Sequence, residues 1–194
     1  MYLVRRWRNG LVAAVLILTL VFSDREAERY GDNFQIALPL AALGCAVATG
    51  AGGEYLLRFL GMWTTTHASK QGLGEAAINI RPGGGDLGFP SGHTSASAFG
   101  ASSLVFACLT DAPLIKTGVV FAAAFTGASR IEADKHTIWQ VLAGAIWAVL
   151  WERALRRPGP VRDRVVASLR RVLRTMERPL RVAGGWARSA WRRR

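Results

Sequence analysis

The sequence is poor in cysteine, with only Cys45 and Cys108 in 194 residues. Both lie inside apolar runs, and two cysteines offer neither the spacing of a metal site nor a framework of disulfide bonds. We interpret them as small buried hydrophobic residues. The sequence therefore predicts no disulfide bond and no cysteine-based metal site.

The sequence also lacks an apolar run as long as the roughly 20 residues that a membrane-spanning helix needs. Shorter apolar runs recur instead, and flanking Trp, Tyr and Arg side chains extend them by lying at the membrane interface. This pattern predicts an all-α fold, a polytopic membrane helical bundle of about six transmembrane helices. The runs cover residues 11–22, 34–49, 55–66, 94–109, 114–128 and 138–151.

The first run follows Arg5, Arg6 and Arg8. A basic flank before a short apolar run is also typical of a secretory signal peptide. The residues after this run, 21–24, do not form the small-x-small pattern of a cleavage site. We therefore expect the first run to be retained as a span.

Acidic residues are scarce at the C-terminal end, and this scarcity locates the net charge of +12. Residues 153–194 contain 14 Arg and two acidic residues, whereas residues 1–152 hold 11 basic and 11 acidic groups. The positive charge thus belongs to a tail, not to a nucleic-acid-binding face of the domain. We predict a membrane domain over residues 1–157 and a basic tail over residues 158–194.

Apolar residues recur at helical spacing through the tail, with Arg between them. Such a basic amphipathic stretch is expected to bind anionic lipids of the cytoplasmic leaflet. A solvated disordered tail and a nucleic-acid-binding tail are the alternatives.

Basic residues before the first run and after the sixth set the orientation. An even number of spans places both termini on one side, and the positive-inside rule makes that side cytoplasmic. The two polar loops, predicted over residues 68–93 and 129–136, then lie on the extracytoplasmic face. The Arg- and Ala-rich composition is typical of a bacterial chain, so we expect the inner membrane.

The two loops concentrate the groups that phosphoryl transfer needs. Cations neutralise phosphate oxygens, one imidazole attacks and another protonates the leaving oxygen. The chain has only three His, and two of them are here. The candidate groups are Lys70, Arg81, Ser91, His93, Arg130 and His136.

Two local patterns refine this site. Ser91, Gly92 and His93 precede the fourth run, where a helix N-terminus offers free N–H groups to a phosphate and Gly92 permits close approach; a simple turn and cap is the alternative. His136 and Gln140 are four residues apart, so the glutamine oxygen can accept a hydrogen bond from one imidazole nitrogen and leave the other free. A merely capping or packing Gln140 is the alternative.

Over residues 11–152 the sequence resembles the type-2 phosphatidic acid phosphatase (lipid phosphate phosphatase) family, as a bacterial membrane member. Three segments carry the resemblance: Lys70 with Arg81-Pro82, the run Pro-Ser-Gly-His at 90–93, and Ser129-Arg130 followed by His136. The chain departs from the family pattern twice. Ten residues separate Lys70 from Arg81 instead of about six, and Gln140 replaces an Asp that normally orients the nucleophile.

The resemblance implies a metal-independent phosphatase without cofactors, acting on a phosphatidate-like lipid, a polyprenyl phosphate or a lipid A phosphate. It implies that His136 forms a phosphohistidine, that His93 protonates the departing oxygen, and that Gln140 stands in for the orienting Asp. The implied phosphate-binding groups are Lys70, Arg81, Ser91, the Gly92 amide and Arg130.

Two other functions stay open at this point. Gln140 carries no charge, so the chain is alternatively a weak or inactive family member that binds anionic lipids. The same histidine chemistry would also serve a phosphotransferase that passes the phosphoryl group to a second lipid. Oligomeric state does not follow from the sequence.

Overall fold

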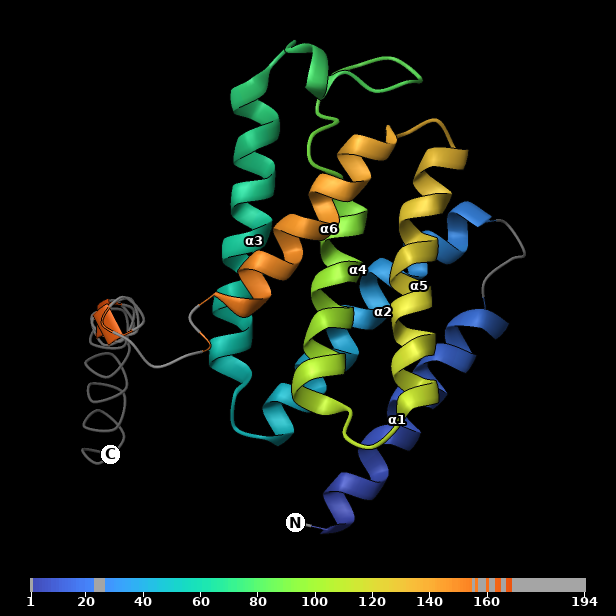
Figure 1. Cartoon of the computed structure of the whole chain (residues 1–194), viewed down its shortest axis with the longest axis vertical. Helices are drawn as coiled ribbons and strands as arrows, with labels where there is room; N and C mark the ends of the chain where they lie inside the picture. The colour runs from blue at the N-terminus through green and yellow to red at the C-terminus, as the bar shows by residue number, and fades with distance from the viewer. Residues whose placement is uncertain are drawn as a thin grey trace, which may run out of the picture. The chain divides into compact units, whose positions relative to one another are not determined.

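The computed structural model describes residues 2–22 and 27–154, together with residues 156, 160, 163, 164, 167 and 168. Within these residues the regular structure is helical and contains no strand, which confirms the all-α class. A 3₁₀ turn, η1 (Ala77–Asn79), precedes α4, and a π-helical turn, η2 (Leu104–Cys108), continues it. The α-helices are α1 (Tyr2–Val21), α2 (Ala27–Ala48), α3 (Gly52–Leu73), α4 (Gly92–Ser103), α5 (Pro113–Glu132) and α6 (Ile138–Arg153), one on each predicted run (Figure 1).

The chain divides into two compact units, residues 1–154 and residues 155–194. All six α-helices belong to the first unit. The predicted basic tail at 158–194 lies outside the described residues apart from a few single positions.

Helix α4 is the centre of the bundle and packs against α2, α3, α5 and α6 (Figure 1). Two glycines allow the backbones to approach closely. A Cβ at Gly100 would lie 2.5 Å from the backbone of Leu38 and Pro39 in α2, and a Cβ at Gly144 in α6 would lie 2.7 Å from the Ser91 carbonyl oxygen. Small residues at such crossings let helices pack through backbone contact.

Cys45 and Cys108 form a disulfide bond, so the prediction of two unpaired buried cysteines is wrong. The bond joins the C-terminal part of α2 to η2, with a Cα–Cα distance of 6.0 Å. The partners are 63 residues apart in sequence. Their pairing depends on how α2 packs on η2, which the spacing of two cysteines does not reveal.

One end of the bundle collects the polar loops. There α3 and α5 end, and α2, α4 and α6 begin (Figure 1). We call this end the loop end. The functional residues predicted from the sequence all lie at or near it.

Helix α3 continues to Leu73, so the prediction of a loop from residue 68 is wrong at its start. Lys70 therefore lies on the last turns of a helix. The buried Asn79 side chain explains the extension, because its Nδ2 donates to the carbonyls of Lys70 (2.9 Å) and Gly74 (2.7 Å). Its Oδ1 accepts from the Phe89 amide at 2.8 Å. Asn79 thus satisfies carbonyls at the helix end and fixes the loop to it.

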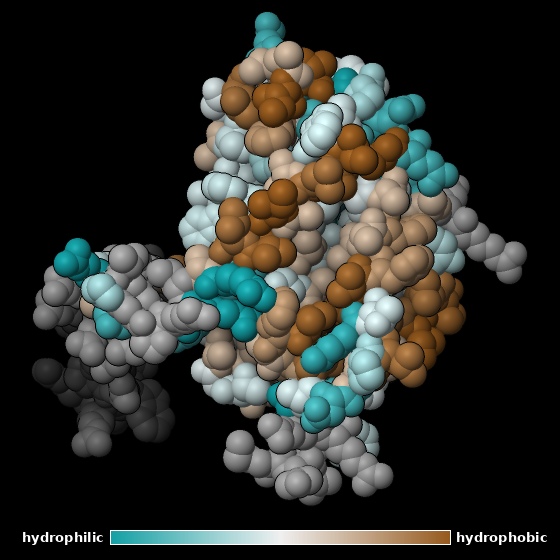
Figure 2. Space-filling view, viewed as in Figure 1, coloured by the Kyte–Doolittle hydropathy of each residue, from teal (hydrophilic) through white to brown (hydrophobic). Residues whose placement is uncertain are grey.

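Many large apolar side chains remain exposed on the flanks of the bundle. Leu114 is 87% exposed, Phe121 69% and Trp139 71%. Figure 2 shows apolar surface running along α6 and beside α5 on one face. By length and composition, one described helix, α5, suffices to cross a membrane, and the apolar stretch Trp7–Val21 in α1 is shorter.

Candidate active site

His136 and Gln140 form the best-defined contact of the site. His136 is buried in the short loop before α6, and its Nδ1 lies 3.1 Å from Gln140 Oε1. Gln140 Nε2 donates to the carbonyls of Ile78 (2.9 Å) and Ile80 (2.8 Å). Because the amide nitrogen is committed to these acceptors, Oε1 faces the imidazole and the N–H belongs to Nδ1. His136 Nε2 therefore keeps its lone pair.

Gln140 is also the third residue of α6 and part of a capping box. Its backbone N–H donates to the Thr137 hydroxyl at 3.2 Å, and its Oε1 accepts from the Thr137 amide at 3.1 Å. Both interpretations made from the sequence thus describe real contacts: Gln140 caps the helix and it also contacts the imidazole. The capping box fixes the side chain that holds His136.

The environment of His136 favours its neutral form. Burial lowers the pKa of His136 to about 4, against an upward contribution from the Gln140 hydrogen bond. The positive charges of Lys70, Arg81 and His93 lower it further. At neutral pH the imidazole is therefore unprotonated, and its free nitrogen is nucleophilic.

Lys70 and Arg81 meet despite the ten residues between them. Lys70 Nζ donates to the Leu87 carbonyl at 2.6 Å, and Arg81 Nη2 donates to the same oxygen at 3.2 Å. Leu87 has a φ of 66°, so the loop turns sharply at the shared acceptor. Arg81 Nε is buried and makes no hydrogen bond within the part of the chain described here. It is a donor available to an anion.

Ser91, Gly92 and His93 open α4. Ser91 is fully buried and caps the helix, with its hydroxyl oxygen 3.0 Å from Thr94 Oγ1 and accepting from the Thr94 amide. The Ser91 amide donates to the Gln140 carbonyl at 2.9 Å, which ties this segment to the one that carries His136. A Cβ at Gly92 would meet no atom within 4 Å, so the helix start is open on that side.

Arg130 lies in the last turn of α5, which continues to Glu132; the predicted loop from residue 129 therefore starts too early. The guanidinium is 1% exposed. Nη1 donates to Asp32 Oδ1 at 2.9 Å, Nη2 to the Glu28 carbonyl at 2.6 Å, and Nε to the Ser129 hydroxyl at 3.3 Å. Two of the five N–H groups of a guanidinium remain for a ligand.

Helix α2 contributes two carboxylates that sequence reasoning missed. Asp32 Oδ1 lies 3.1 Å from His93 Nε2, and Glu28 accepts a hydrogen bond from Lys135. Gly31 lies between them, where a Cβ would fall 2.1 Å from Ser129 Oγ, so only glycine lets α2 approach α5 so closely. The available signal was the four-residue spacing of Glu28 and Asp32, which places both on one helix face.

The helix starts and ends thus bring together two imidazoles, three buried or half-buried cations and two carboxylates at the loop end. His136 offers a nucleophilic nitrogen, His93 is partnered by a carboxylate, and the cations suit an anion with several oxygens. This arrangement offers the groups that binding and transfer of a phosphoryl group require.

The chain belongs to the PAP2 superfamily, whose family model matches residues 54–159. Members of this superfamily generally hydrolyse phosphoesters, so the chain is a member of a phosphatase family. No curated protein and no solved structure matches the chain. The match begins in α3, so α1 and α2, including Glu28 and Asp32, precede it.

Proposed function

We propose that the chain is a membrane lipid phosphatase that cleaves a phosphomonoester or pyrophosphate of a lipid through a phosphohistidine on His136. The observation that carries this proposal is an apolar groove that begins beside the candidate active site. A soluble phosphoester would need only the polar end of the molecule, whereas a lipid needs both.

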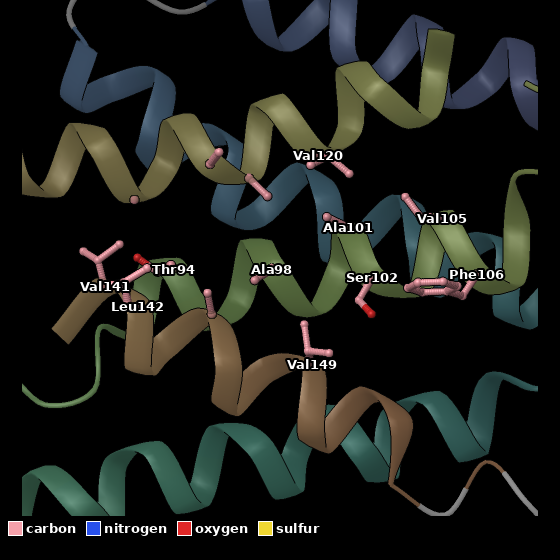
Figure 3. A pocket seen from close by; sticks show the side chains of 14 residues that line it. Thr94, Ala98, Ala101, Ser102, Val105, Phe106, Val120, Val141, Leu142 and Val149 are labelled. Carbon is pink, nitrogen blue, oxygen red and sulfur yellow. The ribbon is translucent and has the colours of Figure 1, made fainter. Parts of the chain in front are cut away.

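The groove has a volume of about 460 Å³ and lies between α5 and α6, with α4 as its floor (Figure 3). Its side chains are almost entirely apolar, and Phe106 lines it toward the end of α4 that lies away from the loop end. Thr94, Gly127 and Val141 line it at the loop end. Thr94 follows His93 directly and contacts the Ser91 hydroxyl. A hydrocarbon chain in the groove would therefore place its phosphate at the site.

The reaction proceeds in two steps on this geometry. His136 Nε2 attacks phosphorus while the bond to the lipid oxygen breaks, and His93 gives its proton to that oxygen. Gln140 Oε1 holds the Nδ1–H of the resulting phosphohistidine. Water then attacks phosphorus, His93 takes a proton from it, and the bond to Nε2 breaks to release phosphate. Lys70, Arg81 and Arg130 neutralise the phosphoryl oxygens in both steps.

Exposed apolar side chains support the membrane part of the proposal. Soluble monomers rarely expose extended apolar surface of this kind, and here it covers the flanks of helices whose ends carry the site. The basic segments at both termini favour a cytoplasmic location for the two termini. The loop end would then lie on the extracytoplasmic face of a bacterial inner membrane. In the same arrangement the tail binds anionic lipids.

A lipid panel tests the proposal. Purified protein in detergent is incubated with phosphatidate, a polyprenyl phosphate or pyrophosphate, and a lipid A phosphate, and released phosphate is measured. We expect release from at least one lipid, loss of at least a thousand-fold in His136→Ala, and full activity in His67→Ala. His67 is the matched control, because this third histidine contacts Trp63 in α3. No release by wild type, or equal release by His136→Ala, would refute the proposal.

A further inference from the structure

Helix α2 lies before the part of the chain that matches the family model, yet its first turns supply carboxylates to the site. Asp32 Oδ1 contacts both His93, from the Pro-Ser-Gly-His segment, and Arg130, from the Ser-Arg segment. It lies 3.1 Å from His93 Nε2 and 2.9 Å from Arg130 Nη1. Both partners are more than sixty residues from Asp32 in sequence and lie on other helices. These contacts therefore depend on how the helices pack.

We propose that Asp32 is a positioning residue for the acid of the reaction, holding the His93 ring by Nε2 so that Nδ1 faces the leaving oxygen. This inference rests on the proposed function. His93 is 35% exposed, and its Nδ1 has no hydrogen-bond partner among the described residues, so this nitrogen is free for the substrate.

The proton balance follows from that geometry. The imidazolium of His93 loses the Nδ1 proton to the lipid oxygen as the P–O bond breaks and the bond to His136 forms. The neutral ring keeps its Nε2–H on Asp32. In the second step Nδ1 accepts a proton from the attacking water, the P–N bond breaks, and the imidazolium is restored. The Asp32 carboxylate keeps its contact with Nε2 in both steps and stabilises the charged ring by its proximity.

Several other titratable and charged groups face His93. Glu28 lies on the same helix as Asp32; Arg130 comes from α5, and Lys135 and His136 come from the loop before α6. Burial of the ring, together with the charges of Arg130 and Lys135, lowers the pKa of His93 and opposes its charge. The two carboxylates favour it, and Asp32 is the one in direct contact.

The dependence on the leaving group separates this role from a purely structural one. A lipid alkoxide needs a proton to depart, whereas 4-nitrophenolate departs without one. We expect Asp32→Asn to lower kcat about 30-fold on dioctanoyl phosphatidate, which is less than the roughly hundred-fold or more that a general acid itself contributes, and less than about three-fold on 4-nitrophenyl phosphate. The alkaline limb of kcat/KM for the lipid should move to lower pH, because the Asp32 carboxylate favours the charged form of His93.

Two further variants complete the experiment. Asp32→Glu should restore part of the lipid activity, and Asp111→Asn, an exposed acid in the turn between η2 and α5, should match wild type. Equal losses of Asp32→Asn on both substrates, or an unmoved alkaline limb, would overturn the inference while leaving the phosphatase intact. An inactive wild type would instead refute the proposed function. A lower melting temperature of Asp32→Asn with an unchanged substrate ratio also counts against the inference.

Discussion

Gln140 donates hydrogen bonds that the Asp found at this position in the family pattern would be unable to donate. Its amide nitrogen donates to the carbonyls of Ile78 and Ile80, and its oxygen holds His136. A carboxylate at this position would face two carbonyl oxygens without a proton to share. The amide therefore suits the long loop of this chain, because it fastens that loop to the nucleophile.

Glu at position 140 tests this interpretation, since it keeps the length and the oxygen but removes both donor bonds. We expect Gln140→Glu to lower the free energy of unfolding by about 1–3 kcal/mol and to lower kcat at least ten-fold. Thermal unfolding in detergent and phosphate release measure the two effects. Gln140→Asp should behave no better. A gain of activity in either variant would show instead that the missing charge limits catalysis.

The buried position of His136 predicts an unusual acid limit. With a pKa of about 4 in the folded protein, below the ordinary value near 6.5, the imidazole keeps its lone pair well into the acid range. We expect kcat/KM, expressed per concentration of the substrate dianion, to fall only as pH drops through about 4. A fall centred near 6.5 would contradict the prediction. The unfolded chain binds this proton first, so His136 also lowers stability as pH falls from 6.5 to 4.

The sequence points to individual candidate residues better than to the contacts between them. His93, Arg130 and His136 carry side chains whose chemistry and spacing are visible in the sequence. Asp32 has no motif around it, because its role arises only when α2 meets α4 and α5. The disulfide between Cys45 and Cys108 escaped prediction for the same reason: both depend on helix packing.

At the scale of the helices, the apolar runs predict that the six α-helices exist and in which order they follow. They do not predict the residues at which the helices end. Helix α3 extends past its apolar run because the Asn79 side chain, in the following turn η1, donates to the carbonyls of Lys70 and Gly74 at the helix end. Helix α5 likewise extends through Arg130, whose charge is neutralised by contacts to α2. Polar residues near a helix end therefore suggest a loop in the sequence when the residues that satisfy their hydrogen bonds lie outside that helix.

The groove between α4, α5 and α6 yields a prediction about chain length. Ala145 lines the groove from α6, and a phenyl ring there would fill part of its volume. We expect Ala145→Phe to lower kcat/KM for dipalmitoyl phosphatidate at least ten-fold, and to change that for 4-nitrophenyl phosphate less than two-fold. Phosphate release from both substrates by the same preparation supplies the control. Equal effects on both substrates would place the lipid chain elsewhere.

At the scale of the whole molecule, the all-α bundle follows from the six apolar runs, and the family from three short segments. The membrane location stays a proposal that the exposed flanks of the helices support. A protease-accessibility experiment on intact spheroplasts, with tags after residue 194 and within the exposed loop at 83–86, would establish on which side each end lies.

The bonds from Gln140 to the carbonyls of Ile78 and Ile80 have a consequence for biosynthesis. The proposed nucleophile, His136, and Gln140, which holds it, both follow residue 135, whereas the loop that Gln140 contacts is made earlier. A nascent chain that ends before residue 136 carries the cations, His93 and Asp32, but it lacks the imidazole that we propose as the phosphoryl acceptor. On the proposed mechanism, such a chain has no phosphoryl acceptor until this last part of the domain has been made.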